Sequence, residues 1–156
     1  MPFEPVTPRL APLCRAHVLI GEPLVVGHTP LGARRIIPIT GGRVEGPRLE
    51  GVVVPGGADW QIVRGDGAAV LEARYTIRSA EGALIYVRNV GVRVGPPEVL
   101  ARLGRGEPVD PAAYYFRTTP RFETAAAPYA WLNDVVAVGS AVRGPDAVIL
   151  DFYTVT

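Results

Sequence analysis

The sequence contains no lysine, only one cysteine and two histidines, and these shortages exclude several kinds of chemistry. All 16 basic residues are arginine, so neither a Schiff-base lysine nor the lysine of a phosphate-binding loop is available. Cys14 stands alone, so no disulfide can form within the chain. His17 and His28 lack a metal-ligand spacing with Cys14 or with a carboxylate, and we therefore expect no metal site.

Motifs for nucleotide binding and for a serine nucleophile are missing as well. The chain has neither a dinucleotide-binding fingerprint nor a P-loop, which argues against NAD and ATP chemistry. Ser140 lies in VGSAV, which lacks the second glycine of a nucleophile elbow. We therefore expect a protein that works without a cofactor.

Charge and hydropathy are also unexceptional. The net charge is +1 and the arginines are scattered, so we expect no nucleic-acid surface and no basic membrane patch. No apolar run reaches 18 residues, and the first residues do not resemble a secretory signal. These features predict a cytoplasmic protein without a membrane span.

What the sequence does contain favours one globular β-rich domain. Hydrophobic residues make up 48% of 156 residues, and 18 glycines and 16 prolines are spread along the chain as turn signals. Four prolines within residues 1–12 predict an extended N-terminal arm, followed by one domain over residues 13–156.

Short runs of strand character follow one another at even spacing, with alternation clearest in Ala68–Arg78. We expect two hairpin corners or kinks at the Gly-Gly pairs, Gly41-Gly42 and Gly56-Gly57, and a bulge or bend at Gly91. The expected strands cover residues 13–20, 24–26, 34–39, 48–54, 59–64, 68–78, 83–94, 114–122, 130–143 and 147–155.

One short helix is expected over Pro96–Gly104, where prolines precede helix formers and a glycine ends the run. Without long crossover helices the strands must pair antiparallel, so we predict an all-β, antiparallel up-and-down barrel of about 8–10 strands. A two-sheet sandwich is the alternative. Two late strands, at Val135–Val138 and Ala147–Leu150, are apolar on both faces, which predicts that another subunit covers them in a homo-oligomer.

A family resemblance supports the barrel. The runs GARRIIPITGGRVEGPRLEGVVVPGGADWQIVR, LEARYTIRSAEGALIYVRNVG, YYFRTTPRFET and YAWLNDVVAVG resemble the domain of unknown function 3237, from about Pro12 to the end of the chain. GGADW and WLN are the most specific elements. The resemblance implies an antiparallel β-barrel that is often oligomeric, and it implies no particular activity.

The strongest candidate for chemistry is Asp59, beside Trp60 and after a Gly-Gly pair. A carboxylate buried next to an indole would have a raised pKa and could act as a general base, although aspartate also commonly caps turns. Tyr75, Tyr86, Arg88 and Asn89 lie on consecutive strands; Tyr or Arg could stabilise an oxyanion, or the group could form a cross-strand ladder.

Further candidates lie elsewhere in the chain. Tyr114, Tyr115, Phe116 and Arg117 could line a pocket for an aromatic or flat ligand, with Arg117 binding its carboxylate, or they could be core residues and a surface arginine. Trp131 and Asn133 could orient a ligand, or Asn133 could satisfy backbone groups. Arg34 and Arg35 must point to opposite faces of their strand, so one of them could look inward, with Arg35 as the candidate, or both could form a solvated surface pair.

Two functions from different classes remain. The first is a barrel that binds a small aromatic or carbonyl compound and acts on it as a cofactor-free isomerase, cyclase or lyase, with Asp59 as the base and Tyr75, Arg88 or Asn133 polarising an oxygen. The second is a non-catalytic barrel, either a ligand binder or a structural oligomer with a filled interior.

Overall fold

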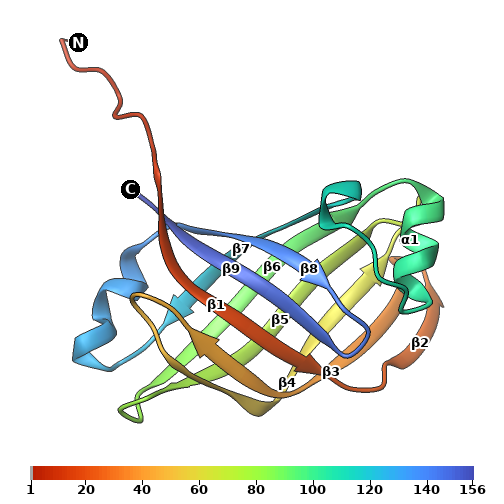
Figure 1. Ribbon diagram of the computed structural model, residues 1–156, viewed down its shortest axis with the longest axis horizontal. Coiled ribbons are helices and arrows are strands. Elements are labelled where there is room, and N and C mark those ends of the chain that lie inside the picture. The colour runs from red at the N-terminus through yellow and green to blue at the C-terminus, as the bar shows by residue number, and fades with distance from the viewer. Residues whose placement is uncertain (1) are drawn as a thin grey trace.

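The computed structural model describes residues 2–156, which form nine antiparallel strands, one α-helix and two 3-10 helices (Figure 1). The strands are β1 (Leu10–Ile20), β2 (Leu24–Thr29), β3 (Gly32–Glu45), β4 (Gly51–Val63), β5 (Ala69–Ser79), β6 (Leu84–Val94), β7 (Tyr115–Glu123), β8 (Ala137–Arg143) and β9 (Ala147–Val155). The helices are α1 (Pro97–Gly104), η1 (Pro111–Ala113) and η2 (Ala127–Asp134).

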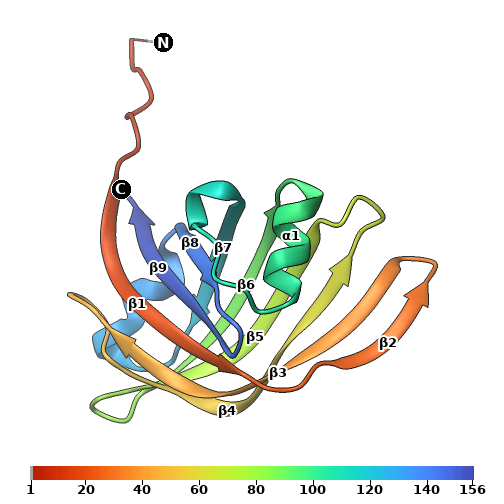
Figure 2. The ribbon, with the colours of Figure 1, turned by 45° about the vertical axis from the view of Figure 1, so that its right-hand side comes forward.

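The sheet closes on itself. Strands β3 to β9 each pair with their neighbours in the chain, and β1 pairs with both β9 and β3. These contacts close an eight-stranded barrel, and β2 is an extra strand that pairs with one end of β3 and extends beyond the barrel wall (Figure 2). The predicted all-β, up-and-down barrel is therefore confirmed, and the β1–β3 pairing excludes an open two-sheet sandwich.

Alternation of side chains sets the inside and the outside of the barrel. Strand β7 alternates exposed and buried residues without interruption, which places Phe116, Thr118 and Phe122 inside. Phe122 packs edge-on against Phe152 of β9, with ring centroids 6.0 Å apart. The barrel interior is thus largely filled by side chains, as expected for eight strands.

The two Gly-Gly pairs lie inside long strands, and the expected hairpin corners are not there. Gly56-Gly57 forms a bulge in β4, because the pairing with β5 shifts by two residues between Val54 and Ala58. A Cβ on Gly57 would lie 2.3 Å from the carbonyl oxygen of Arg74 and 2.7 Å from Cβ of Tyr75. The glycine therefore lets β4 approach β5 closely where Tyr75 enters the interior.

Helix α1 begins and ends close to the expected residues. Pro97 occupies the first turn, and the buried Leu103 together with Val99 and Leu100 packs on the core. None of the helices within residues 2–156 has the length and apolar character needed to cross a membrane.

Two expected boundaries are corrected. Residues 130–134, expected in a strand, belong to the 3-10 helix η2, and β8 begins at Ala137. Pro128 near the start of η2 favours a helical turn, and the Asn133 side chain bonds to the carbonyl oxygen of Ala130 at 3.0 Å, which stabilises that turn. Strand β1 starts at Leu10, so the arm that extends away from the barrel is shorter than residues 1–12 (Figure 1).

Candidate functional site

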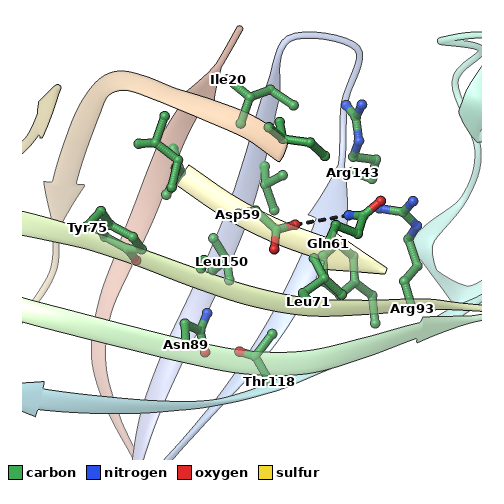
Figure 3. A pocket seen from close by; sticks show the side chains of 16 residues that line it. Ile20, Asp59, Gln61, Leu71, Tyr75, Asn89, Arg93, Thr118, Arg143 and Leu150 are labelled. Carbon is green, nitrogen blue, oxygen red and sulfur yellow. Dashed lines mark hydrogen bonds between the residues drawn. The ribbon is translucent and has the colours of Figure 1, made fainter. Parts of the chain in front are cut away.

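A single cavity in the barrel interior collects side chains from all eight barrel strands (Figure 3). Its volume is about 50 Å³, which is enough for a few waters or part of a small organic molecule. Its apolar lining consists of Val18, Ile20, Ile37, Ile39, Leu71, Ala73, Phe116, Val148 and Leu150. Its polar lining consists of Asp59, Gln61, Tyr75, Asn89, Arg93, Thr118 and Arg143.

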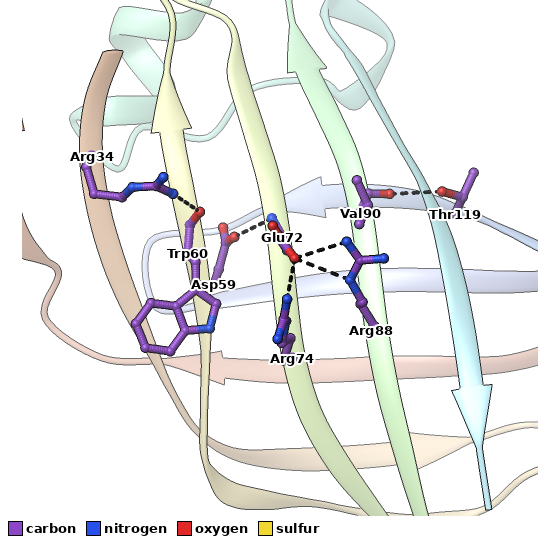
Figure 4. A network of polar contacts seen from close by, with 8 residues as sticks. All are labelled: Arg34, Asp59, Trp60, Glu72, Arg74, Arg88, Val90 and Thr119. Atoms are coloured by element: carbon purple, nitrogen blue, oxygen red, sulfur yellow. Dashed lines mark hydrogen bonds and ion pairs between the residues drawn. The ribbon is translucent and has the colours of Figure 1, made fainter. Parts of the chain in front are cut away.

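Asp59 is the one acidic residue in this lining, and β4 holds it there just after the bulge. Its side chain is buried, with a residue exposure of 7%. Oδ1 accepts a hydrogen bond of 2.9 Å from the backbone N–H of Glu72, and Oδ2 accepts one of 3.0 Å from Nε2 of Gln61 (Figures 3 and 4). Burial raises the pKa of Asp59 above its ordinary value, although both hydrogen bonds and the charges of Arg93 and Arg35 act in the opposite direction.

Gln61 is itself held by Arg35. Nε of Arg35 donates to Oε1 of Gln61 at 3.1 Å, and Nη2 of Arg35 donates to the same oxygen. The guanidinium thereby fixes the amide orientation, so that the NH2 group of Gln61 must face Asp59. As expected, Arg34 and Arg35 point apart: Arg34 donates to the carbonyl oxygen of Trp60 at 2.8 Å on the outside (Figure 4).

Unsatisfied polar atoms concentrate in the cavity. Within residues 2–156, five buried side-chain nitrogen or oxygen atoms find no hydrogen-bond partner in the protein, and every one belongs to a lining residue. They are Tyr75 Oη, Asn89 Oδ1, Arg93 Nε, Thr118 Oγ1 and Arg143 Nη1. Because buried polar groups are nearly always paired, these atoms indicate a place built to meet a polar ligand or ordered water.

Tyr75 provides a hydroxyl to this cavity. It is 4% exposed, and burial raises the pKa of its phenol, so the group stays protonated at neutral pH and can donate a hydrogen bond. The sequence grouped Tyr75 with Tyr86, Arg88 and Asn89, and of these Tyr75 and Asn89 point inward and line the cavity.

Glycines make room beside Thr118. Gly91 pairs regularly with Leu71 and with Thr118, so the bulge expected at Gly91 is absent. A Cβ on Gly91 would lie 2.6 Å from Cγ2 of Thr118, and one on Gly139 would lie 2.3 Å from its Oγ1. The two glycines thus flank the hydroxyl that faces the cavity.

Trp60, Tyr86 and Arg88 lie on the outer face of the barrel and do not reach the cavity. Successive strand residues alternate, so an inward Asp59 requires an outward Trp60, which is 44% exposed. Arg88 pairs with Glu72 at 3.1 Å, and Arg74 pairs with the same carboxylate at 2.7 Å (Figure 4). The predicted substrate-binding role of Trp60, Tyr86 and Arg88 at this site is corrected accordingly.

Tyr115 and Arg117 also face outward, on β7. Tyr115 is 55% exposed, and the Arg117 guanidinium lies 5.2 Å from the centroid of its ring. Phe116 lies between them in the chain and points into the cavity. Of the four residues predicted to line a pocket, Tyr114 to Arg117, Phe116 therefore lines the cavity that holds Asp59, whereas Tyr115 and Arg117 line a separate hollow.

Trp131 and Asn133 belong to η2, away from the cavity. The Trp131 ring stacks under the Arg48 guanidinium at 3.8 Å. The Asn133 side chain accepts from the N–H of Thr124 at 2.9 Å and donates to its carbonyl oxygen at 3.0 Å. These contacts fix a loop, so a catalytic role for Asn133 beside Asp59 is corrected.

Sequence reasoning missed Gln61, Arg93, Thr118 and Arg143 as site residues. Gln61 follows Asp59 by two positions, and Arg93 follows Asn89 by four, so strand alternation alone could have placed them on the inner face. Thr118 follows Phe116 by two positions and could be placed in the same way, whereas Arg143 could be found only from the pairing of β8 with β9.

Comparison with known proteins identifies close relatives without an assigned activity. The model of a family described as "Protein of unknown function (DUF3237)" matches residues 8–155. A UPF0311 protein of Rhodopseudomonas palustris is 50% identical over 136 residues, covering 87% of this chain and 89% of the relative. Its crystal structure superposes with a TM-score of 0.94 over 97% of this chain and 100% of that one, at 45% identity.

Two further structures extend the comparison. A β-barrel-like protein of Acinetobacter baumannii has a TM-score of 0.88 at 45% identity, over 99% of both chains. The hydroalkoxylation enzyme phnH of Penicillium herquei is 24% identical over 152 residues, which is 97% of this chain and 87% of that protein. The structure of an enzyme from the same fungus has a TM-score of 0.73 at 22% identity, over 100% of both chains, and at that identity it bears on the fold alone.

Proposed function

Since the chain belongs to the DUF3237 family of proteins of unknown function, we propose its function from the cavity: it binds a small carbonyl or aromatic compound there and transfers a proton on it, with Asp59 as the general base and acid. Isomerisation, cyclisation and elimination belong to this class of reaction. No cofactor is required, because the proton is taken from one atom of the ligand and returned to another or to water.

The proposal rests mainly on the burial and the raised pKa of Asp59. It is the acidic residue of a mostly apolar cavity, it is buried, and its pKa is raised by that burial. A base whose pKa lies closer to the working pH transfers protons more effectively in both directions. Two donors, the Glu72 N–H and the Gln61 amide, hold the carboxylate in a fixed orientation.

Two hydroxyl groups in the cavity could stabilise the negative charge that proton removal creates on the ligand. When a proton leaves a carbon beside a carbonyl group, negative charge develops on the carbonyl oxygen. A donor placed toward that oxygen stabilises the enolate, and removing one such donor typically costs about 10²–10³ in rate. Tyr75 and Thr118 each present a hydroxyl with no partner in the protein, and both are suited to this task.

The distant relationship to a hydroalkoxylation enzyme agrees with a catalytic barrel. A ligand-binding barrel without catalysis is the second candidate. The hydrogen bond from the Glu72 N–H favours it, because Asp59 satisfies a backbone donor and could be retained for stability alone. Under this alternative, Asp59→Asn would leave ligand affinity unchanged and there would be no reaction to lose.

The test is the exchange of deuterium from D2O into the α positions of 2-tetralone, an aromatic ketone with acidic C–H bonds. Proton NMR follows the loss of the α-hydrogen signals. The wild-type protein is expected to accelerate α-deuteration, and Asp59→Asn to lower that rate by at least about 10²-fold. Asp134→Asn, an exposed acid on η2, is the matched control and should keep the full rate.

Two further variants locate the reaction. Ala73 lines the cavity, so Ala73→Leu fills it, whereas Thr76→Leu on the opposite face of β5 does not. Exchange should be lost in the first and kept in the second. If 2-tetralone binds in the cavity and wild-type protein gives no acceleration, the binding-only alternative is favoured.

A further inference from the structure

One end of the cavity carries an excess of positive charge that the proton-transfer chemistry does not use. Arg93 and Arg143 line the cavity, and Arg35 stands beside it, bonded to Gln61. Asp59 is the one acid in the lining and its charge acts on Arg93 and Arg35, whereas the acid that acts on Arg143 is Asp146 outside the lining. Three guanidinium groups therefore face a single lining carboxylate. The seven ion pairs formed within residues 2–156 involve other arginines, namely Arg15, Arg43, Arg64, Arg74, Arg88, Arg102 and Arg105.

Both lining arginines hold unused donors. Nε of Arg93 and Nη1 of Arg143 are buried and have no hydrogen-bond partner in the protein. A buried donor of a charged group without a partner is costly, and natural proteins retain such groups where something else completes them.

The scaffold holds these side chains in place without consuming their donors. The Arg93 guanidinium lies 5.6 Å from the centroid of the Phe116 ring, which supports it from the adjacent strand. The backbone N–H of Arg143 donates to the Tyr114 hydroxyl at 3.1 Å, which anchors the end of β8. The two side chains come from β6 and β8, on either side of β7, and flank the same space (Figure 3).

The guanidinium groups of Arg93, Arg143 and Arg35 also repel one another. Burial lowers the pKa of Arg93 to about 10, and the charges of Arg143 and Arg35 contribute in the same direction. Burial also lowers the pKa of Arg143, with Arg35 contributing. Arg93 and Arg143 both remain charged at neutral pH, so an anion entering between them would relieve both the desolvation and the repulsion.

We propose that Arg93 and Arg143, backed by Arg35, form an anion subsite of the cavity, so that its ligands are small organic acids whose carboxylate binds the arginines while the apolar remainder lies against the cavity wall. A guanidinium matches a planar carboxylate with two parallel hydrogen bonds. The carboxylate anchor would direct the rest of the ligand toward Asp59 and Tyr75. This inference rests on the proposed role of the cavity as the ligand site.

The experiment compares acids with their neutral amides. Binding of benzoate and benzamide, and of cinnamate and cinnamamide, is measured by titration with the wild-type protein, with isotope-labelled backbone NMR to locate the shifts. Each acid should bind at least tenfold more tightly than its amide, and the shifts should map to cavity residues.

Variants separate the charge from the fold. Arg143→Gln should lower acid affinity at least tenfold and leave amide affinity unchanged, whereas Arg143→Lys should keep most of the preference. Arg78→Gln, an exposed arginine on the outer face of β5, is the matched control and should behave as wild type. Arg93→Gln provides a second loss of charge, and an unchanged thermal transition shows that each variant is folded.

The outcomes distinguish this inference from the proposed function. If amides bind in the cavity as tightly as acids, the anion subsite is wrong and the cavity remains a ligand site. If neither member of either pair binds in the cavity at millimolar concentration, both proposals are contradicted. If acids bind preferentially but Arg143→Gln and Arg93→Gln leave that preference unchanged, the arginine assignment is overturned.

Discussion

Gln61 donates a hydrogen bond of 3.0 Å from Nε2 to Oδ2 of Asp59, two residues before it on the same face of β4. Gln61 is 1% exposed, and Arg35 holds its amide oxygen from the other side. The base candidate is therefore part of a chain of contacts that runs from Arg35 through Gln61 to Asp59. Each member of that chain influences the pKa of the carboxyl group.

The Gln61→Met variant removes one donor to this carboxylate while keeping a side chain of similar length. The lost hydrogen bond should raise the pKa of Asp59 further, because it favoured the ionised form. We expect a loss of about 1–3 kcal/mol in the free energy of unfolding at neutral pH, since a buried charged acceptor loses a partner. Carbon-13 NMR titration of the Asp59 carboxyl and urea denaturation measure the two effects. A carboxyl titration midpoint in Gln61→Met that equals or lies below that of wild type would contradict the role of this hydrogen bond.

The Asp59→Asn variant should change how stability depends on pH. The pKa of Asp59 in the folded chain lies above its ordinary value of 3.8, so the folded chain binds more protons than the unfolded chain between the two values. The stability that this group contributes is therefore fully present below about pH 3.8 and is lost as pH rises through the folded pKa.

The measurement is the free energy of unfolding of both proteins between pH 3 and pH 8. The value for wild type minus the value for Asp59→Asn should decrease as pH rises from about 3.8. An increase over that range would mean that the folded pKa is depressed, and the candidate base would lose its main support.

The Gly57→Ala variant tests the bulge that positions the site. Its new Cβ would meet the Arg74 carbonyl oxygen at 2.3 Å and the Tyr75 Cβ at 2.7 Å, and both lie on a packed strand. We expect a loss of about 1–3 kcal/mol or more from this overpacking. Gly65→Ala is the control, because nothing lies within 4 Å of its Cβ, and it should stay within about 0.5 kcal/mol of wild type. Equal thermal transitions for the two variants would contradict the close approach.

The homo-oligomer expected from the sequence remains a prediction. Strand β2 is a candidate for the contact between subunits. Leu24, Val25 and Val26 are 61%, 73% and 59% exposed, and β2 pairs with β3 along one edge. An exposed apolar edge strand is suited to pairing with a second copy. Light scattering should show an oligomer for wild type and a monomer for Val25→Lys, while Leu84→Lys, an exposed residue on β6, should not dissociate it. A monomeric wild-type protein would contradict the prediction.

The barrel could be predicted from the sequence because its evidence is local. Alternation in Ala68–Arg78 and turns at even spacing need no knowledge of distant contacts, and they placed most strands within a few residues. The Gly-Gly pairs misled because glycine marks bulges as well as corners, and only the pairing partner tells them apart. Residues 130–134 misled because an apolar composition does not distinguish a strand from a 3-10 helix with a proline in its first turn.

The candidate site could be predicted only in part. Asp59, Tyr75 and Arg35 do lie at or beside the cavity, because their strands and faces could be judged locally. Trp60 was chosen as a neighbour in the chain, although neighbours in a strand face opposite ways. Arg143 lies on β8 and Arg93 on β6, with β7 between them. Their approach depends on the order of strands in the sheet, which one sequence does not display.

The most direct test of Asp59 as the base is the pH dependence of α-hydrogen exchange on 2-tetralone, measured beside the carbon-13 titration of the Asp59 carboxyl. If Asp59 is the base, the rate should rise with pH, with a midpoint that coincides with the titration of Asp59, lies above 3.8 and moves upward in Gln61→Met. The rise should disappear in Asp59→Asn. An exchange rate in Asp59→Asn equal to that of wild type, or a midpoint that does not follow the Asp59 titration, would contradict the claim that Asp59 is the base.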